Sequence, residues 1–349
     1  TNLTTGVDVP RSDPSRPAPF QTFLVTGGAN ESGVATNEVT IMAVSTESAD
    51  TSDARPIRLT LSQPRAWHTA TQLDDGRVLI AGGVDVNGAP LRSTEIFDPF
   101  TRLLSAGPDL LVARSHHTAV RLTSGDVAFF GGRGTGGAAL DSVEAYNFTP
   151  VGSPTALNTA LPSLSRAQSR AHAVLMPDQR VLVTGGIDGS GVAVQTAELL
   201  NPLHDDDPNT PTTKSPRFEP AGNSMLAARK YGSATALLDG NVLFAGGAGA
   251  DNAAVASLEV FNAATNRFEP VDVTMRTAHV PSTWHRCSVT GPSCWRVARR
   301  RWSRSPRRSW PVPTSSSSPR ATRVAPGRAS SCPSTVTCSC RAAWPPRRW

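Results

Sequence analysis

The residues best suited to chemistry in this chain are five histidines within its first 278 positions, because imidazoles hold metal ions and move protons. One of them, His204, opens an acidic stretch, and the other four lie at or beside a single recurring position: His68, His116, His117 and His172. Metal ligands must converge on one ion at bonding distance, whereas equivalent positions of a repeat protein are a whole repeat apart. We therefore predict that these histidines are structural, and we assign no catalytic, cofactor-binding or metal-binding residue.

The acidic stretch His204–Asn209 is the second candidate, since it places Asp205, Asp206 and Asp207 in succession. Clustered carboxylates suit a hard cation such as calcium, but a dedicated calcium loop has spaced oxygen ligands and a glycine at its turn. The stretch has neither, so we expect a solvated acidic loop.

Charged side chains also recur at fixed places. A glutamate lies twelve residues after each of four recurring pairs of glycines. The recurring charged residues are Arg65, Arg114 and Arg229 together with Glu95, Glu144, Glu198 and Glu259. Recurrence in register indicates architecture, and a partly buried ion pair is acceptable when it is well hydrogen-bonded. We predict that each arginine lies within salt-bridge reach of a repeat glutamate in the same or the adjacent repeat.

The three arginines belong to a stretch that the chain repeats. Residues 65–83 return as 114–132 and 229–247, and a copy one residue shorter ends at residue 186. Each copy ends in two glycines, and successive pairs are 55, 49, 54 and 61 residues apart: 27–28, Gly82 and Gly83, Gly131 and Gly132, Gly185 and Gly186, and Gly246 and Gly247. A period near 50 residues is typical of a repeat architecture.

Each unit predicts four short antiparallel strands. An alternating segment comes first, an Asp-Gly turn follows, and a short apolar run then ends at the glycines. The glutamate lies in a third strand, and turn residues such as Asp98-Pro99 lead into a fourth, for example Arg102–Ser105. We expect the apolar runs 78–81, 127–130, 181–184 and 242–245 to be inner, buried strands, because such short runs are covered on both faces.

The motifs R-x-x-H-x-A and D-G-x-V-L-x-x-G-G resemble those of bacterial kelch-repeat β-propellers. The resemblance covers residues 17–278 and implies an all-β fold of four-stranded antiparallel blades, with five in-frame repeats and an incomplete ring. Two departures stand out: the first copy lacks the Arg/His strand, and Gly232 replaces the histidine in the fifth.

The related galactose-oxidase propellers use a copper site with a Tyr–Cys cross-link, a second tyrosine and two histidines. Residues 1–278 hold two tyrosines, Tyr146 and Tyr231, and no cysteine. The cross-link cannot form from these residues, so the resemblance extends to the fold and not to the copper site.

Charge divides the chain in two. Residues 1–278 carry 20 basic and 28 acidic side chains, while residues 279–349 carry 14 arginines and no acid. An acidic body gives no reason to expect nucleic acid as a partner. No run of 18 apolar residues predicts a transmembrane segment. Residues 1–16 are predicted to be an exposed linker, although Thr4–Val9 could instead be an outer strand of the last blade, and such a lead-in favours an extracellular or cell-envelope location.

The last 71 residues change in character. All five cysteines and six of the seven tryptophans lie at or after Trp284, among arginine, serine and proline. Read one nucleotide earlier, with G or C in the third codon position, this segment can spell R-A-x-H-V-A-P-L-L-G-D-G-P-V-V-L-A-G-G, which is another copy of the repeat. We therefore expect residues 279–349 to be an out-of-frame, disordered tail rather than a basic tail or a cysteine scaffold.

Function in a propeller should lie in what differs between blades, and hence in the loops. The sequence predicts a non-enzymatic module that binds a protein or glycan through its loop face, although fold alone does not fix function. The alternative is the propeller domain of a carbohydrate-active or oxidase-like enzyme, which would need acids, histidines or metal ligands that converge near the axis.

Overall fold

The computed structural model describes residues 2–3, 20–45, 56–147, 158–202 and 215–275. All of them belong to one unit, Thr1–His285. The predictions for most of the linker, for the strand Thr4–Val9, for the acidic stretch His204–Asn209 and for the tail concern residues outside these ranges.

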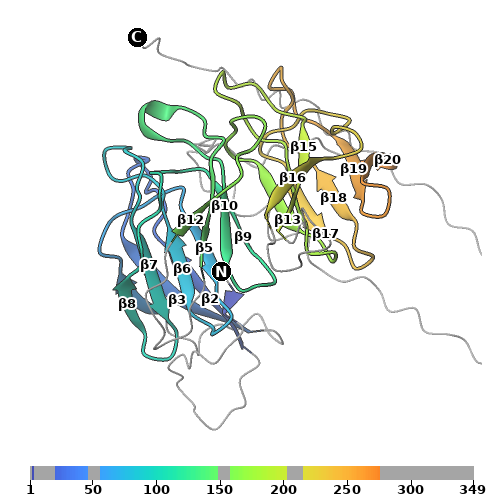
Figure 1. Ribbon diagram of the computed structural model, residues 1–349. Helices are drawn as coiled ribbons and strands as arrows, with labels where there is room; N and C mark the ends of the chain where they lie inside the picture. The colour runs from blue at the N-terminus through green and yellow to red at the C-terminus, as the bar shows by residue number, and fades with distance from the viewer. Residues whose placement is uncertain (1, 4–19, 46–55, 148–157, 203–214, 276–349) are drawn as a thin grey trace, which may run out of the picture. The chain divides into compact units, whose positions relative to one another are not determined.

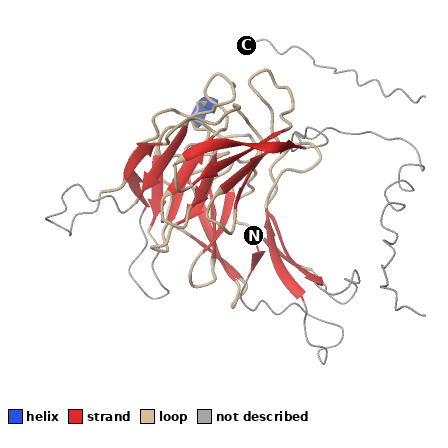
Figure 2. Ribbon diagram, turned by 90° about the vertical axis from the view of Figure 1, so that its right-hand side faces the viewer, coloured by secondary structure: helices blue, strands red, loops and turns tan. Residues whose placement is uncertain are grey.

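The described chain is all-β and forms five sheets of four antiparallel strands (Figure 1). In sheet order these strands are β1 Asn2–Leu3, β2 Phe20–Thr26, β3 Glu38–Ser45 and β4 Ile57–Thr60; β5 Thr69–Gln72, β6 Val78–Ala81, β7 Thr94–Asp98 and β8 Leu103–Ala106; β9 Thr118–Arg121, β10 Val127–Phe130, β11 Val143–Tyr146 and β12 Asn158–Leu161; β13 His172–Leu175, β14 Val181–Thr184, β15 Ala197–Asn201 and β16 Arg217–Pro220; and β17 Ser233–Ala236, β18 Val242–Ala245, β19 Ser257–Asn262 and β20 Arg267–Thr274. Figure 2 shows how completely strands dominate; the one helix there is the short 3-10 turn η1, Thr135–Gly137.

The first sheet takes its initial strand from the start of the chain. Asn2 pairs with Phe23 and Leu3 pairs with Thr22, so β1 occupies the place that β5 has in the second sheet. These two residues fall within the range 1–16 that the sequence predicted to be a linker. The first repeat, which lacks the Arg/His strand, thus obtains its inner strand from further upstream.

The second strands of the last four sheets are largely buried, as predicted. Strands β6, β10, β14 and β18 coincide with the four predicted apolar runs, and the first three are buried at every residue. Alternate residues serve opposite neighbours: Val78 and Ile80 pack with the first sheet, while Leu79 and Ala81 pack with the third. A continuous apolar run rather than an alternating one follows from burial on both faces.

Four hydrophobic clusters lie between successive sheets. A fully buried phenylalanine anchors each of them, in chain order Phe97, Phe129, Phe130 and Phe244. Burial of one such side chain stabilises the fold by about 1.5–3 kcal/mol. The sheets are therefore held face to face by side-chain packing, while hydrogen bonds hold the strands within each sheet.

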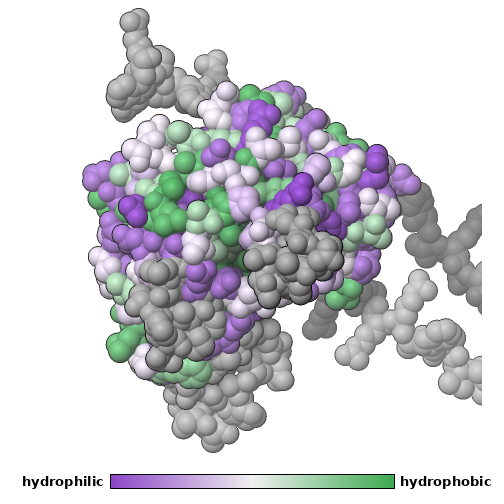
Figure 3. Space-filling view, in the orientation of Figure 1, coloured by the Kyte–Doolittle hydropathy of each residue, from purple (hydrophilic) through white to green (hydrophobic). Residues whose placement is uncertain are grey.

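Burial decreases toward the outer strands. In β8 and β16 three and two of the four residues, respectively, are exposed. Strand β8 begins at Leu103 rather than at the predicted Arg102, because Arg102 has a φ of 60° and its N–H donates to the Asp98 carbonyl in the preceding turn. Hydrophobic residues on the face in Figure 3 lie in small groups among hydrophilic ones.

The paired glycines join successive sheets. The N–H of the second glycine donates to a backbone carbonyl at the start of the next sheet, at 2.8 Å from Gly28 to Arg65 and at 2.9 Å from Gly83 to Arg114. The later sheets repeat the bond, from Gly132 to Gln168 at 2.9 Å and from Gly186 to Arg229 at 3.1 Å. Each pair is thus a backbone junction between blades.

At the pair Gly82 and Gly83 no larger residue fits. Both glycines of every pair have positive φ, for example 62° at Gly82 and 99° at Gly83. A Cβ atom would lie 2.5 Å from the Arg114 carbonyl oxygen at Gly82, and 2.6 Å from the Ala66 carbonyl oxygen at Gly83. The backbone conformation and the close approach of a second backbone both require glycine.

The two contributions can be separated by substitution. Gly88 also has a positive φ, 80°, but a Cβ there would meet nothing within 4 Å. Gly88→Ala should cost only the left-handed conformation, about 1–2 kcal/mol, whereas Gly83→Ala should cost clearly more because it also displaces the Ala66 carbonyl. Urea unfolding of both variants provides the measurement, and equal losses would show that the junction is not sterically constrained.

Candidate functional site

The repeated arginines are buried structural residues. The side chains of Arg65, Arg114 and Arg229 are all 0% exposed. The Arg114 guanidinium donates to the carbonyls of Gly131 at 2.7 Å and Ser142 at 3.0 Å, and it pairs with Glu144 at 2.7 Å. Burial lowers the pKa of the Arg114 guanidinium, while the Glu144 carboxylate opposes that shift.

The other two arginines repeat this arrangement. Arg65 pairs with Glu95 at 3.0 Å, and Arg229 pairs with Glu259. The second oxygen of Glu95 accepts a hydrogen bond from the Ser62 N–H at 2.9 Å, so the carboxylate also fixes the chain that enters the sheet. The predicted ion pairs are confirmed, each within a single repeat.

The fourth sheet departs from this pattern. Gln168 occupies the arginine position, and its Oε1 atom is buried with no hydrogen-bond partner among the described residues. Glu198 instead accepts hydrogen bonds from the Ser165 hydroxyl at 2.7 Å and from the Ser165 N–H at 3.0 Å. Glu198 is thus the repeat glutamate without a repeat arginine in its sheet, and the hydroxyl and backbone N–H of Ser165 supply its donors.

The described histidines come from three sheets, and they form no group that could hold a metal. His68 and His117 each bond to a threonine of the preceding sheet, Thr26 at 2.8 Å and Thr69 at 2.9 Å. His172 lies one position further along its repeat, and its ring packs edge-on against Phe244. Burial, assisted by the repeat arginine beside each ring, lowers the pKa of His68 and of His172 to about 4. These rings are neutral in the folded protein near neutral pH.

One repeat position differs in chemistry from sheet to sheet. It lies two residues after the arginine position, and the four described copies are Trp67, His116, Arg170 and Tyr231. All four have a positive φ, between 52° and 59°. Large side chains rarely adopt this conformation, which costs about 1–2 kcal/mol each, and such strain is a reason to look for function.

These four residues form a contacting group, which we call the aromatic–arginine cluster. The rings of Trp67 and His116 are stacked, with centroids 4.9 Å apart. The Arg170 guanidinium carbon lies 5.2 Å from the Trp67 ring centroid and 4.9 Å from the Tyr231 ring centroid. Backbone hydrogen bonds, from His116 to the Trp67 carbonyl and from Arg170 to the His116 carbonyl, link the first three in series.

The cluster lies at the end of the sheets that we call the loop face. Because β5 begins where antiparallel β6 ends, the residue that precedes each inner strand is at the same end as the loop that follows each glycine pair. The inner strands β5, β9, β13 and β17 contact one another in succession, so their preceding residues approach each other. The Asp-Gly turns lie at the opposite end.

The electrostatic balance of the cluster is positive. Arg133, which follows a glycine pair, places its Nε atom 3.5 Å from the Ser169 hydroxyl. The pKa of His116 is lowered to about 3, mainly by burial and next by the positive charges of Arg170 and Arg133. Among the described residues, neither Arg133 nor Arg170 forms a salt bridge.

A cavity of about 430 Å³ opens beside the cluster. Its walls are the loops 84–90 and 133–137, and His116, Ser115 and Arg133 also line it. The wall residues include Val84, Ala89 and Pro90 together with Asn87, Thr135 and several glycines, so the lining is mainly apolar with a few polar groups. An imidazole and a guanidinium are therefore accessible from a cavity on the loop face.

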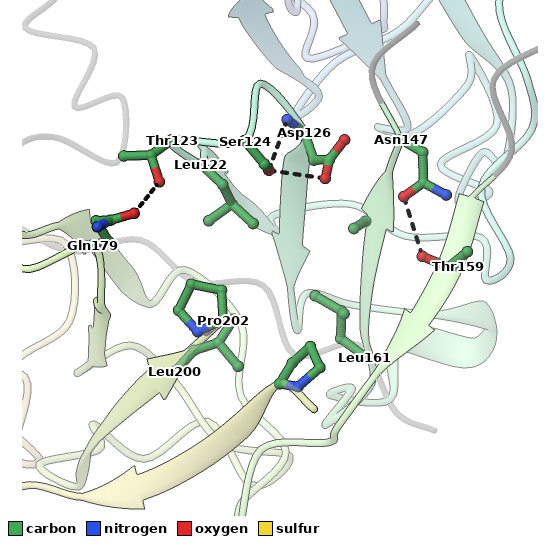
Figure 4. A pocket seen from close by; sticks show the side chains of 12 residues that line it. Leu122, Thr123, Ser124, Asp126, Asn147, Thr159, Leu161, Gln179, Leu200 and Pro202 are labelled. Carbon is green, nitrogen blue, oxygen red and sulfur yellow. Dashed lines mark hydrogen bonds between the residues drawn. The ribbon is translucent and has the colours of Figure 1, made fainter. Parts of the chain in front are cut away.

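A second cavity, of about 370 Å³, lies between the third and fourth sheets at the turn face (Figure 4). Leu122, Leu161 and Leu200 line it, and Thr123 bonds to Gln179 across its edge at 2.9 Å. Its lining is mixed, because Ser124, Asp126, Asn147 and Thr159 face it together with leucines and prolines.

A copper site of the galactose-oxidase kind does not fit these residues. Tyr146 is buried between the second and third sheets, where burial raises the pKa of its phenol. Tyr231 lies in the cluster beside Arg170, and no cysteine precedes Cys287. Within the described ranges, no three residues among histidine, cysteine, aspartate and glutamate lie together as a group that could hold a metal.

The loop aspartates are used as turn caps. Asp85 Oδ1 accepts hydrogen bonds from the N–H groups of Asn87 and Ala89, and Asp188 does the same for Ser190 and Val192. Those backbone bonds, with Arg166 adjacent, lower the pKa of Asp188.

No helix in the described part of the chain is long and apolar enough to cross a membrane.

Comparison with solved structures supports the propeller fold. The chain is similar to YjhT, with a TM-score of 0.56 and 15% identity over 72% of this chain and 81% of that one. It is also similar to a fungal alcohol oxidase of the AA5 family in complex with copper, with a TM-score of 0.55 and 17% identity over 75% of this chain. It spans about half of that oxidase, 52%. No protein-family model matches the chain, and no curated protein is significantly similar to it.

Removal of one repeat arginine should destabilise the fold strongly. Arg114→Met leaves the Glu144 carboxylate buried without its counter-charge, which should cost about 3–5 kcal/mol. Arg121→Met is the matched control, because Arg121 pairs with Asp74 at the surface and such pairs contribute at most about 1 kcal/mol. Equal losses for the two variants in urea unfolding would refute the structural role of the buried pair.

Stability should depend on pH through the buried histidines. Their pKa values are lower in the folded protein than the unfolded value of about 6.5, so the unfolded chain binds more protons once the pH falls below 6.5 or so. The free energy of unfolding should then decrease toward about pH 4, by at most about 1.4 kcal/mol per pH unit for each histidine. His172→Gln should reduce that slope, and an unchanged slope would contradict the low pKa of His172.

Proposed function

We propose that this chain is a kelch-type β-propeller that binds a protein or glycan ligand at its loop face without converting it chemically. The proposal rests on a difference between repeat positions that keep the same residue chemistry and one position that does not. Positions with the same chemistry in successive sheets are used in packing, ion pairs and junctions. The position that differs, occupied by the aromatic–arginine cluster, brings four unlike side chains together beside a cavity.

The chemistry of the cluster suits recognition. Tryptophan, tyrosine and arginine dominate binding energy where proteins meet ligands, and Trp67 is 44% exposed although its ring is stacked on His116. The strained backbone at these positions costs stability that glycine would avoid. A role for the side chains themselves accounts for both features.

The enzymatic alternative gains no support from the described residues. A hydrolase or lyase needs an acid and a base that converge on substrate, but the ionisable groups that the structure gathers beside the cavity are His116, Arg133, Arg170 and Tyr231, and no described carboxylate pairs with either arginine.

The location in the cell envelope or outside the cell remains part of the proposal, as does the out-of-frame origin of the tail.

Binding of the full chain to glycan and peptide arrays tests the proposal. A retained ligand should lose affinity by about tenfold or more on Trp67→Ala or Tyr231→Ala. Phe100→Ala is the matched control, because Phe100 is 67% exposed in the β7–β8 turn at the opposite end. Ligands that both cluster variants bind as tightly as the parent chain would place recognition elsewhere.

A further inference from the structure

Arg170 is held so that its donors are available. Its guanidinium lies over both the Trp67 and the Tyr231 rings, and stacking of this kind uses the flat faces of the group. Contact with the flat faces leaves the N–H groups, which lie in the guanidinium plane, able to donate. Within the described ranges, no salt bridge or side-chain hydrogen bond engages them.

A second guanidinium reinforces the charge at the same place. Arg133 is close enough that its charge lowers the pKa of Arg170, after burial and against the effect of Tyr231. Arg133 has one weak side-chain hydrogen bond, to Ser169 at 3.5 Å. Two like charges that are partly removed from water are unfavourable unless an anion compensates them.

Nearby carboxylates do not supply that compensation. Asp188 pairs with Arg166 and caps its own loop, and Asp85 caps the loop that forms one wall of the cavity. The site therefore has an excess of cationic donors with no described internal partner. An external anion is the species that would complete it.

The cavity limits the size of that anion. Its volume of about 430 Å³ lies at the low end of the range for small-molecule sites, about 300–1,000 Å³. The loops 84–90 and 133–137 wall it on two sides, and a long extended chain would have to cross them. Planar guanidinium groups match the planar, two-oxygen geometry of a carboxylate.

We infer that the loop face binds a small organic carboxylate, with Arg170 as the main donor and Arg133 as the second. This inference goes beyond the proposed function, because it adds a small-molecule ligand at the same face. Trp67 and Tyr231 hold the Arg170 guanidinium in place, while the adjacent cavity, which His116 and Arg133 line, accommodates the remainder of the ligand.

Calorimetry on the full chain with matched probes tests the inference. Malonate and galacturonate should bind, and their neutral counterparts malonamide and galactose should bind at least about tenfold more weakly. Arg170→Gln and Arg133→Gln should each weaken binding of the acids by about tenfold or more, and Arg170→Lys should fall between, because an ammonium is not a planar fork. Arg121→Gln, which removes a surface charge elsewhere, should change nothing.

Several results would overturn the inference. These are equal binding of acids and neutral counterparts, wild-type affinity in Arg170→Gln and Arg170→Lys, tighter binding of inorganic phosphate than of either acid, and binding of an acidic peptide but of no small acid. The outcome for the proposed function is separate. A ligand that Trp67→Ala weakens but the arginine variants do not would refute the carboxylate and leave the binding role in place.

Discussion

The hydrogen bond from the second glycine of each pair to the first residues of the next sheet is the interaction on which the rest of this structure depends. The bond joins neighbouring sheets at all four described junctions. At three of them the accepting residue is an arginine whose guanidinium pairs with a glutamate of its own sheet, as Arg114 does with Glu144. One arginine thus fixes both the spacing between sheets and the register within a sheet. At Gly83, Gly132 and Gly186 glycine is required, because a Cβ would lie 2.6, 2.7 and 2.5 Å, respectively, from a backbone oxygen.

Sequence predicted the parts of the fold that follow from periodicity. The bounds of the four buried strands were predicted correctly from the apolar runs, because burial on both faces requires every position to be apolar. The recurrence of arginine and glutamate in register predicted that the two would form ion pairs. Gln168 was missed because Ser165 can satisfy Glu198 through its own hydroxyl and N–H. The inner strand Asn2–Leu3 was missed because pairing over a long sequence separation has no local pattern.

The candidate site was the least predictable part. Its four residues share a position and no chemistry, so a search for repeated motifs passes over them. Their left-handed backbone could not be predicted from the sequence, because bulky residues rarely adopt positive φ. The sequence does contain one signal. At a single position of an otherwise regular repeat, the residues differ from one another: Trp67, His116, Arg170 and Tyr231. The conserved geometry of the junction holds these variable side chains at one place, so the scaffold and the site are physically linked.

Native-state hydrogen exchange at the junction glycines tests that account most directly. The N–H groups of Gly83, Gly132 and Gly186 donate to the next sheet, so their exchange should require global unfolding and should be as slow as that of the buried strand β10. The Gly88 N–H, in an exposed turn, should exchange through local opening. Fast exchange at the three junction glycines, with the β10 amides still protected, would contradict the claim that this bond holds the sheets together.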